Sequence, residues 1–127
     1  MTDPEARGER FPPAARIRGT EQIRATFREG RRHVVGPVEL FARPSPAGRP
    51  RLAIVVPRHG HSIVERNRVR RRLREIARRE WLPEALRRGA ALDVVVRARR
   101  GAYGTPFEGL RSALCSGLED LTWDDGS

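Results

Sequence analysis

Eight arginines fall within the fourteen positions from 66 to 79, in the segment ERNRVRRRLREIARRE (residues 65–80). Each guanidinium group offers a planar fork of N–H donors that matches phosphate oxygens, and its face can also stack on a base. Asn67 adds an amide that can contact a phosphate, a sugar or a base edge. The chemistry of this segment therefore predicts binding to a nucleic acid, and charge alone leaves open which one.

The same segment is predicted to be a helix with one face in the protein core. Val69, Leu73, Ile76 and Ala77 lie within about 100° of one another on a helical wheel, the width of a core-facing stripe. Arginines occupy most of the remaining surface, and between the outermost of them only Glu75 opposes their charge. Like charges four residues apart destabilise a helix by about 0.2–0.5 kcal/mol per pair. A solvated face would carry acidic partners, so we infer that an anionic partner offsets this cost.

The composition points to the same kind of partner. The 127 residues contain 26 arginines, no lysine and 16 acidic residues, which gives a formal charge of +10. Self-repulsion on this scale disfavours a compact state unless a polyanion binds, so a nucleic acid is the leading partner, ahead of an anionic membrane surface. The single cysteine, Cys115, excludes a disulfide within the chain. No apolar run reaches membrane-spanning length and no signal peptide is recognisable, so we expect a cytoplasmic protein without a membrane partner.

The elements around the basic helix form a pattern typical of an α+β fold. Helices are expected at 20–30, 65–80, 84–89 and 105–118, and strands at 33–42, 51–56 and 91–99. Gly30 is expected to end the first helix. The Pro- and Gly-rich stretch 43–50 predicts a turn that joins the first two strands as an antiparallel hairpin. The order α-β-β-(β)-α-β-α predicts a two-layer α/β sandwich, in which helices pack on a small mixed sheet.

A single domain is expected from the chain length. Residues 1–15 are polar, contain proline and lack periodicity, so they are predicted to be a flexible tail. The α/β domain is predicted to span residues 16–120, and residues 121–127 are predicted to be a short acidic tail.

The segment RNRVRRRLRE (66–75) resembles the arginine-asparagine-arginine signature of the bacterial ribonuclease P protein subunit. Its surroundings agree with this family. ARIRGTEQIRATFREG (15–30) is similar to the family's first helix and the stretch before it, RLAIVVPRH (51–59) to the strand before the signature, and LDVVVRAR (92–99) to the strand after the long helix. The resemblance runs from about Arg16 to Leu118 in the family's order, and four matching segments are far more specific than one.

The resemblance implies a fold, an activity and partners. The fold is an α/β sandwich with an unusual left-handed βαβ crossover that contains the basic helix. The activity is removal of the 5′ leader from precursor tRNA, an endoribonuclease reaction carried out by an RNA subunit that uses Mg²⁺, with no catalytic residue in the protein. The expected partners are ribonuclease P RNA and precursor tRNA, without an obligate protein partner.

The resemblance also implies two groups of site residues. The RNA-binding group consists of Arg58, Arg66, Asn67, Arg68, Arg70, Arg71 and Arg74. The leader-binding group is Phe27, Phe41 and Ile23, in a cleft between the first helix and the sheet; Ile23 stands where the family commonly has an aromatic residue. From the residues alone, core packing of the two phenylalanines is the simpler interpretation. The loop departs from the family at Gly60 and Ser62, and its two histidines predict phosphate contact rather than a metal site.

Other functions stay open at this point. A ribosomal or other RNA-binding protein with a basic helix shares the charge and the size of this chain. A DNA-binding regulator of the leucine-zipper kind is disfavoured, because no leucine heptads follow the basic segment and Pro83 ends the helix. A protein enzyme is disfavoured because the sequence has no phosphate-binding loop and no recognisable nucleophile motif.

Overall fold

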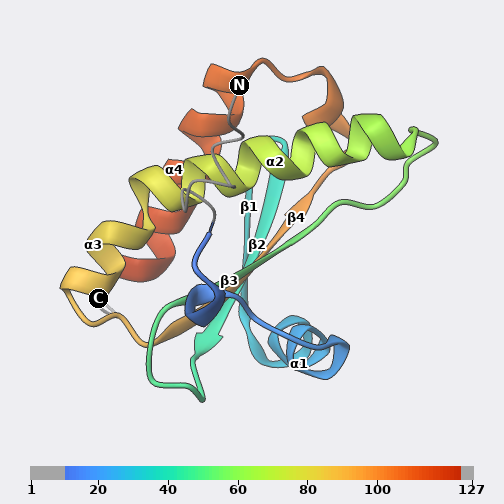
Figure 1. The fold of residues 1–127 in the computed structure, drawn as a ribbon. Helices are drawn as coiled ribbons and strands as arrows, with labels where there is room; N and C mark the ends of the chain where they lie inside the picture. Colours follow the sequence, from blue (N-terminus) through green and yellow to red (C-terminus); the bar gives the residue numbers. More distant parts are fainter. Residues whose placement is uncertain (1–10, 124–127) are drawn as a thin grey trace.

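The computed structural model describes residues 11–123, and in it a four-stranded sheet carries helices on both faces (Figure 1). The strands are β1 (Arg31–Val35), β2 (Val38–Pro44), β3 (Arg51–Val55) and β4 (Leu92–Ala98). They lie in the order β1-β2-β4-β3. The pairs β1–β2 and β2–β4 are antiparallel, whereas β3 and β4 are parallel. The predicted α+β class with a small mixed sheet is confirmed.

The hairpin of the sheet lies inside residues 33–42, where the sequence predicts one strand. Gly36 and Pro37 form a two-residue turn between β1 and β2, and Gly36 has φ +52°, which residues with a side chain rarely adopt. The hairpin predicted across residues 43–50 is wrong, because β4 lies between β2 and β3. Turn residues identify a reversal of the chain, but they do not reveal that a later strand inserts at that place.

Three helices cover one face of the sheet (Figure 1): α2 (Ile63–Glu80), α3 (Leu82–Arg87) and α4 (Phe107–Trp123). The predicted apolar stripe of α2 is confirmed, since Val69, Leu73, Ile76 and Ala77 are at most 4% exposed. The connection of the parallel strands β3 and β4 through α2 and α3 confirms the βαβ unit; its left-handed sense stays a prediction. Within residues 11–123, no helix combines the length and the apolar character needed to cross a membrane.

Helix α1 (Thr20–Glu29) lies on the opposite face of the sheet (Figure 1), where a second and smaller core forms. Ile17, Phe41 and Val95 are buried there, and the half-buried Ile23 and Phe27 of α1 pack against them. Successive strand residues point to opposite faces, so β2 and β4 contribute to both cores. The sheet therefore separates the surface that carries α2 from the surface that carries α1.

The folded part begins before Arg16, at which the domain was expected to start. Phe11 is 2% exposed and packs in the main core with Ala15, and residues 13–15 form a short 3-10 helix. The predicted tail is therefore wrong for residues 11–15, because an aromatic side chain anchors them. At the other end α4 continues to Trp123 and buries Leu121. The remainder of the two predicted tails, residues 1–10 and 124–127, lies outside the described residues.

Gly30 follows the last residue of α1, as predicted, but the reason for glycine is space. Its φ is −80°, which any residue adopts, whereas a Cβ atom would lie 2.5 Å from the carbonyl oxygen of Thr26 and 2.9 Å from that of Ala42. Both are backbone atoms, so α1 would have to move away from β2. We expect Gly30→Ala to lower the free energy of unfolding by about 1–3 kcal/mol in urea denaturation. Gly101→Ala, where a Cβ meets open space, is the control, and equal losses would contradict this account.

Candidate nucleic-acid interface

The start of α2 is fixed by a reciprocal pair of hydrogen bonds. The Glu65 N–H donates to the Ser62 hydroxyl at 3.1 Å, and the Ser62 N–H donates to the Glu65 carboxylate at 2.9 Å. The hydrogen bonds to this carboxylate, chiefly the one from the Ser62 backbone and next the one from His61, lower the pKa of Glu65. The Ser-x-x-Glu spacing of this capping box can be recognised in the sequence, but the helix was predicted to begin at residue 65 and it begins at Ile63. The arginine-rich helix therefore begins at a defined residue, Ile63.

The loop before α2 is held by Tyr103, from the 3-10 helix that follows β4. The Tyr103 hydroxyl donates to the Pro57 carbonyl at 2.8 Å, and its ring stacks on His61 with centroids 3.6 Å apart. His59 has φ +49° and Gly60 has φ +84°, so the chain turns sharply between these two anchors. Arg58, in the same loop, is exposed. The loop thus presents its arginine from a fixed backbone next to the first turn of α2.

The predicted arginines of α2 differ in how much of their hydrogen-bonding capacity is used. Arg68 and Arg71 are exposed, and no protein partner binds them within residues 11–123. Arg66 donates to the carbonyl of Val56 at 3.3 Å, and Arg70 donates to the amide oxygen of Asn67. Neither of those acceptors carries a charge. The N-terminal half of α2 therefore keeps its positive charge.

The carboxylates of α2 are engaged elsewhere. Glu75 pairs with Arg78 at 2.7 Å and with Arg79 at 3.7 Å, toward the C-terminal end of the helix. Glu80 pairs with Arg111 of α4, and the hydrogen bond from that arginine lowers the pKa of Glu80. Across the described part of the chain, Arg58, Arg68, Arg71 and Arg72 have no carboxylate partner. The arginines that lack a carboxylate partner therefore lie in the loop before α2 and within residues 68–72 of the helix, where an anion can reach them.

The last predicted RNA-binding arginine connects this surface with the other face of the sheet. Arg74 lines a pocket of about 200 Å³ together with Ile17 and Ile23 from the α1 side, and with Ala53 of β3. Since β3 is the edge strand here, the pocket lies where the two faces meet. The structure therefore brings one member of each predicted group, Arg74 and Ile23, to one place.

Phe27 and Phe41 lie together in the second core. Their ring centroids are 4.7 Å apart and the rings are nearly perpendicular, with an angle of 81°. Phe41 is only 7% exposed, and Phe27 is half-buried. The guanidinium carbon of Arg97 lies 5.1 Å and 5.2 Å from the two centroids, within the range of cation–π contacts. The aromatic pair is thus covered by Arg97, which lies outside both predicted groups of site residues.

A buried carboxylate holds Arg97 in this position. Glu39 of β2 is 6% exposed and accepts hydrogen bonds from Arg97 at 2.9 Å and from Arg32 at 2.6 Å. Burial raises the pKa of Glu39, and the hydrogen bonds from Arg32 and Arg97 outweigh this, so that the pKa lies below its usual value. The carboxylate therefore stays ionised at neutral pH, and the arginine above the rings stays anchored.

A second buried carboxylate fastens α1 to the sheet. Asp93 of β4 is 0% exposed and accepts two hydrogen bonds from Arg51, at 2.8 Å and 2.7 Å, while Arg43 lies 3.5 Å away. The side-chain oxygen of Gln22 in α1 accepts from both arginines, at 3.1 Å and 3.2 Å. Asp93, a charged residue directly before the three consecutive valines of β4, was the readable signal for this cluster. The network fixes the distance between α1 and the strands below it.

A helix with unneutralised arginines on one face of a small α+β sandwich, and a partly open aromatic pair on the other face, are typical of a nucleic-acid-binding protein. The family model of ribonuclease P matches residues 11–122. The chain therefore belongs to the ribonuclease P protein family. Membership of this family implies that its partner is RNA. The predicted resemblance is confirmed, while the roles of individual residues stay predictions.

Solved structures agree with this assignment. The chain superimposes on the RNase P protein from Thermotoga maritima with a TM-score of 0.68 and 26% sequence identity, over 82% of this chain and 94% of that one. The Staphylococcus aureus RNase P protein gives a TM-score of 0.70 at 20% identity, over 84% of this chain and 94% of that one. The second comparison supports the fold, and the two together show that the described domain spans nearly the whole length of these proteins.

Proposed function

We propose that this ribonuclease P protein subunit assists the removal of the 5′ leader from precursor tRNA by binding two RNA elements. The N-terminal half of α2 and the loop before it bind the ribonuclease P RNA, and the cleft between α1 and the sheet binds the unpaired leader. The observation that carries the proposal is the open positive charge of Arg58, Arg68 and Arg71, which no carboxylate of the described chain neutralises. Location in the cytoplasm belongs to the same proposal.

The first surface suits folded RNA. Arg68 and Arg71 are exposed on one helix, three positions apart, and neighbours at this spacing lie about 5–6 Å from each other. Adjacent phosphates of one strand can therefore be bound by adjacent guanidinium groups, each through a pair of N–H donors. Arg58 extends this row from the Tyr103-anchored loop. Counterions released from the RNA on contact supply a large part of the binding free energy.

The chemistry of the reaction is assigned to the RNA subunit with its Mg²⁺ ions. Mg²⁺ prefers oxygen ligands in octahedral geometry, and the open face of α2 offers guanidinium groups instead. Such a face can reduce repulsion between phosphates, but it cannot hold the metal. We therefore expect the protein to lower the Mg²⁺ concentration that RNA folding and substrate binding require, with no catalytic residue of its own.

Reconstitution tests this proposal. Processing of precursor tRNA by the cognate RNA subunit is measured at low Mg²⁺ with and without the protein, and the protein is also assayed alone. We expect cleavage only when the RNA is present, and faster cleavage when the protein is added. Cleavage by the protein alone would contradict the assignment of the chemistry to RNA. RNA that co-purifies with the protein should be the ribonuclease P transcript, whereas ribosomal RNA would favour the ribosomal alternative.

The leader cleft makes a separate prediction. Phe27 is half-buried at the open side of the aromatic pair, and stacking of an unpaired base contributes about 1–3 kcal/mol. We expect Phe27→Ala to weaken binding of leader-bearing precursor by about fivefold or more, and to leave mature tRNA binding nearly unchanged. Equilibrium binding of the two RNAs to the reconstituted enzyme measures the difference. Equal loss for both would mean that Phe27 serves only the core.

A further inference from the structure

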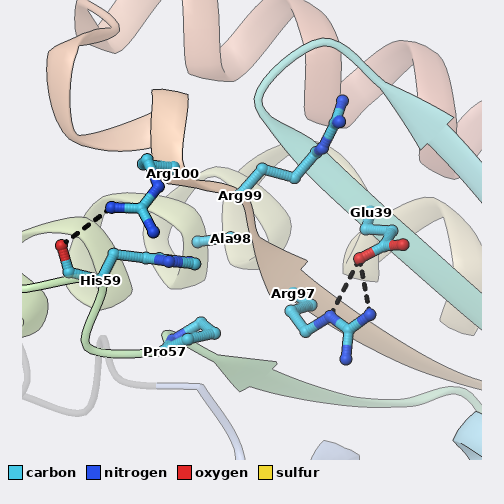
Figure 2. A pocket seen from close by; sticks show the side chains of 7 residues that line it. All are labelled: Glu39, Pro57, His59, Arg97, Ala98, Arg99 and Arg100. Atoms are coloured by element: carbon cyan, nitrogen blue, oxygen red, sulfur yellow. Dashed lines mark hydrogen bonds and ion pairs between the residues drawn. The ribbon is translucent and has the colours of Figure 1, made fainter.

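A pocket of about 360 Å³ lies where β4 ends beside the loop that precedes α2 (Figure 2). Its lining residues are Glu39, Pro57, His59, Arg97, Ala98, Arg99 and Arg100. In Figure 2, Arg97 and Glu39 lie across the pocket from His59 and Arg100, while the side chain of Arg99 points away. The volume falls within the range of about 300–1,000 Å³ that is typical of small-ligand pockets. The space is therefore sufficient for one small planar group.

Arg97 belongs both to this pocket and to the aromatic pair. Its guanidinium group contacts the rings of Phe27 and Phe41, whereas neither ring lines the pocket. The side chain is 38% exposed, so part of it remains available to a ligand. Glu39 holds it through a hydrogen bond of 2.9 Å and an ion-pair contact of 2.8 Å. A guanidinium fixed in this way is a preformed flat surface on which a base can stack.

The charges around the pocket select an anionic ligand. Glu39 is the only carboxylate among the lining residues, and it is already shared by Arg32 and Arg97. Arg100 is exposed and donates to the carbonyl of His59 at 3.3 Å, which leaves most of its donors unused. The Nε2 atom of His59 is buried without a hydrogen-bond partner in the described chain. The pocket thus has the planar guanidinium group of Arg97 on one side and the exposed guanidinium group of Arg100 on the other.

We propose that this pocket binds one unpaired nucleotide of the RNA strand in the cleft, with its base on the guanidinium of Arg97 and its phosphate toward Arg100. The proposal rests on the proposed function of the cleft and goes beyond it, because it adds Arg97 as a stacking surface for a second base beside the one proposed at Phe27. Phe41 packs against the guanidinium group of Arg97 and, at 7% exposure, has little surface left for a base. Glu39 and Phe41 act as positioning residues for Arg97.

The test uses the full chain reconstituted with its RNA subunit. Precursor tRNAs are prepared in which each leader nucleotide in turn lacks its base, and their binding is compared with that of the intact precursor. In the wild type we expect one position at which loss of the base weakens binding between about fivefold and a hundredfold. We expect Arg97→Ala to bind the intact precursor more weakly than the wild type by a similar factor. Removal of the base at that position should then cause no further loss of affinity in Arg97→Ala. Arg97→Lys keeps the charge but not the plane, so it should show the same pattern as alanine.

The controls separate stacking from charge and from folding. Arg87→Ala removes an arginine that also pairs with a glutamate, Glu84, but lies on α3. Its binding should depend on the position of the missing base in the same way as that of the wild type. Glu39→Gln keeps Arg97 but weakens the interaction that holds it in place. Loss of the base at the same position should therefore weaken binding less than it does in the wild type. If Arg97→Ala retains the full wild-type penalty at that position, or weakens precursor and mature tRNA equally, the inference is wrong. Thermal melting of each variant verifies the fold.

A second measurement distinguishes this inference from the proposed function. The isolated full chain is titrated with a short single-stranded RNA that carries one abasic nucleotide at each position in turn. If the wild-type enzyme binds precursor and mature tRNA equally, leader binding is contradicted. The nucleotide pocket would still be supported if loss of the base at one position of the short RNA weakens binding to the wild type but not to Arg97→Ala. Absence of such a penalty in the short RNA, together with its absence in the leader, would overturn the inference.

Discussion

The double variant Arg68→Ala, Arg71→Ala is expected to bind the ribonuclease P RNA about tenfold more weakly, or worse, for each arginine that contacts a phosphate. The dependence of affinity on salt should also change. Each phosphate contact contributes about 0.7–0.9 to the slope of log affinity against log salt concentration, so loss of two contacts should make the slope shallower by about 1.4–1.8. The physical reason is that these two exposed guanidinium groups have no partner within the described chain and are available to displace counterions.

The matched control removes the same number of charges from another surface. Arg87 and Arg88 both pair with Glu84 of α3, so Arg87→Ala, Arg88→Ala changes the net charge by the same amount. Its slope should remain that of the wild type. Filter binding at several salt concentrations measures all three proteins. A slope that changes equally in both double variants would mean that net charge matters and that the face of α2 is not a defined interface.

The second large effect is expected on stability, from Asp93→Ala. This carboxylate is fully buried and compensates Arg51 and Arg43, which are themselves 12% and 11% exposed. Its removal leaves Arg51 without a carboxylate partner in the described chain, and it leaves Arg43 only the half-exposed Glu29, at 3.2 Å. Nε of Arg43 already has no partner among the described residues. Breaking a buried pair in this way costs about 3–5 kcal/mol. Urea denaturation should show a loss of this size in the free energy of unfolding.

A surface pair provides the comparison. Glu108 pairs with Arg111 at 3.1 Å, but its side chain is 70% exposed, so Glu108→Ala should change the free energy of unfolding by less than about 1 kcal/mol. If Asp93→Ala costs no more than Glu108→Ala, the two arginines must reach solvent in the variant. Because Gln22 links these arginines to α1, we also expect Asp93→Ala to weaken leader binding more than binding of the RNA subunit.

Helical periodicity was the part of the sequence that predicted the structure best. The stripe on α2 is buried as expected, and its arginines lie on the open side, because both follow from the geometry of a single helix. The pairing of strands was predicted incorrectly. Which strand lies beside β2 depends on where residues 92–98 return after two helices, and no local signal in residues 43–50 encodes that.

The site was foreseen to the extent that it is local. The arginines of one helix could be identified from their spacing, and the aromatic pair from the family. The carboxylates that position the cleft could not, because Glu39 meets Arg97 across 58 positions and Asp93 meets Arg51 across 42. Such partners are chosen by strand register. Asp93 and Arg97 nevertheless lie four positions apart on β4, so the sequence did indicate that one face of this strand carries a charged residue on either side of Val95.

Strand β4 takes part in both surfaces at once, since Val94 and Val96 point toward the helices while Val95 and Arg97 point toward the cleft. The thickness of one sheet therefore works as a spacer of fixed length between whatever α2 binds and whatever the cleft binds. Rotation of side chains cannot alter that length, and a slip of β4 by a single residue would exchange its two faces. In a complex, the position of one bound RNA element would then dictate the position of the other.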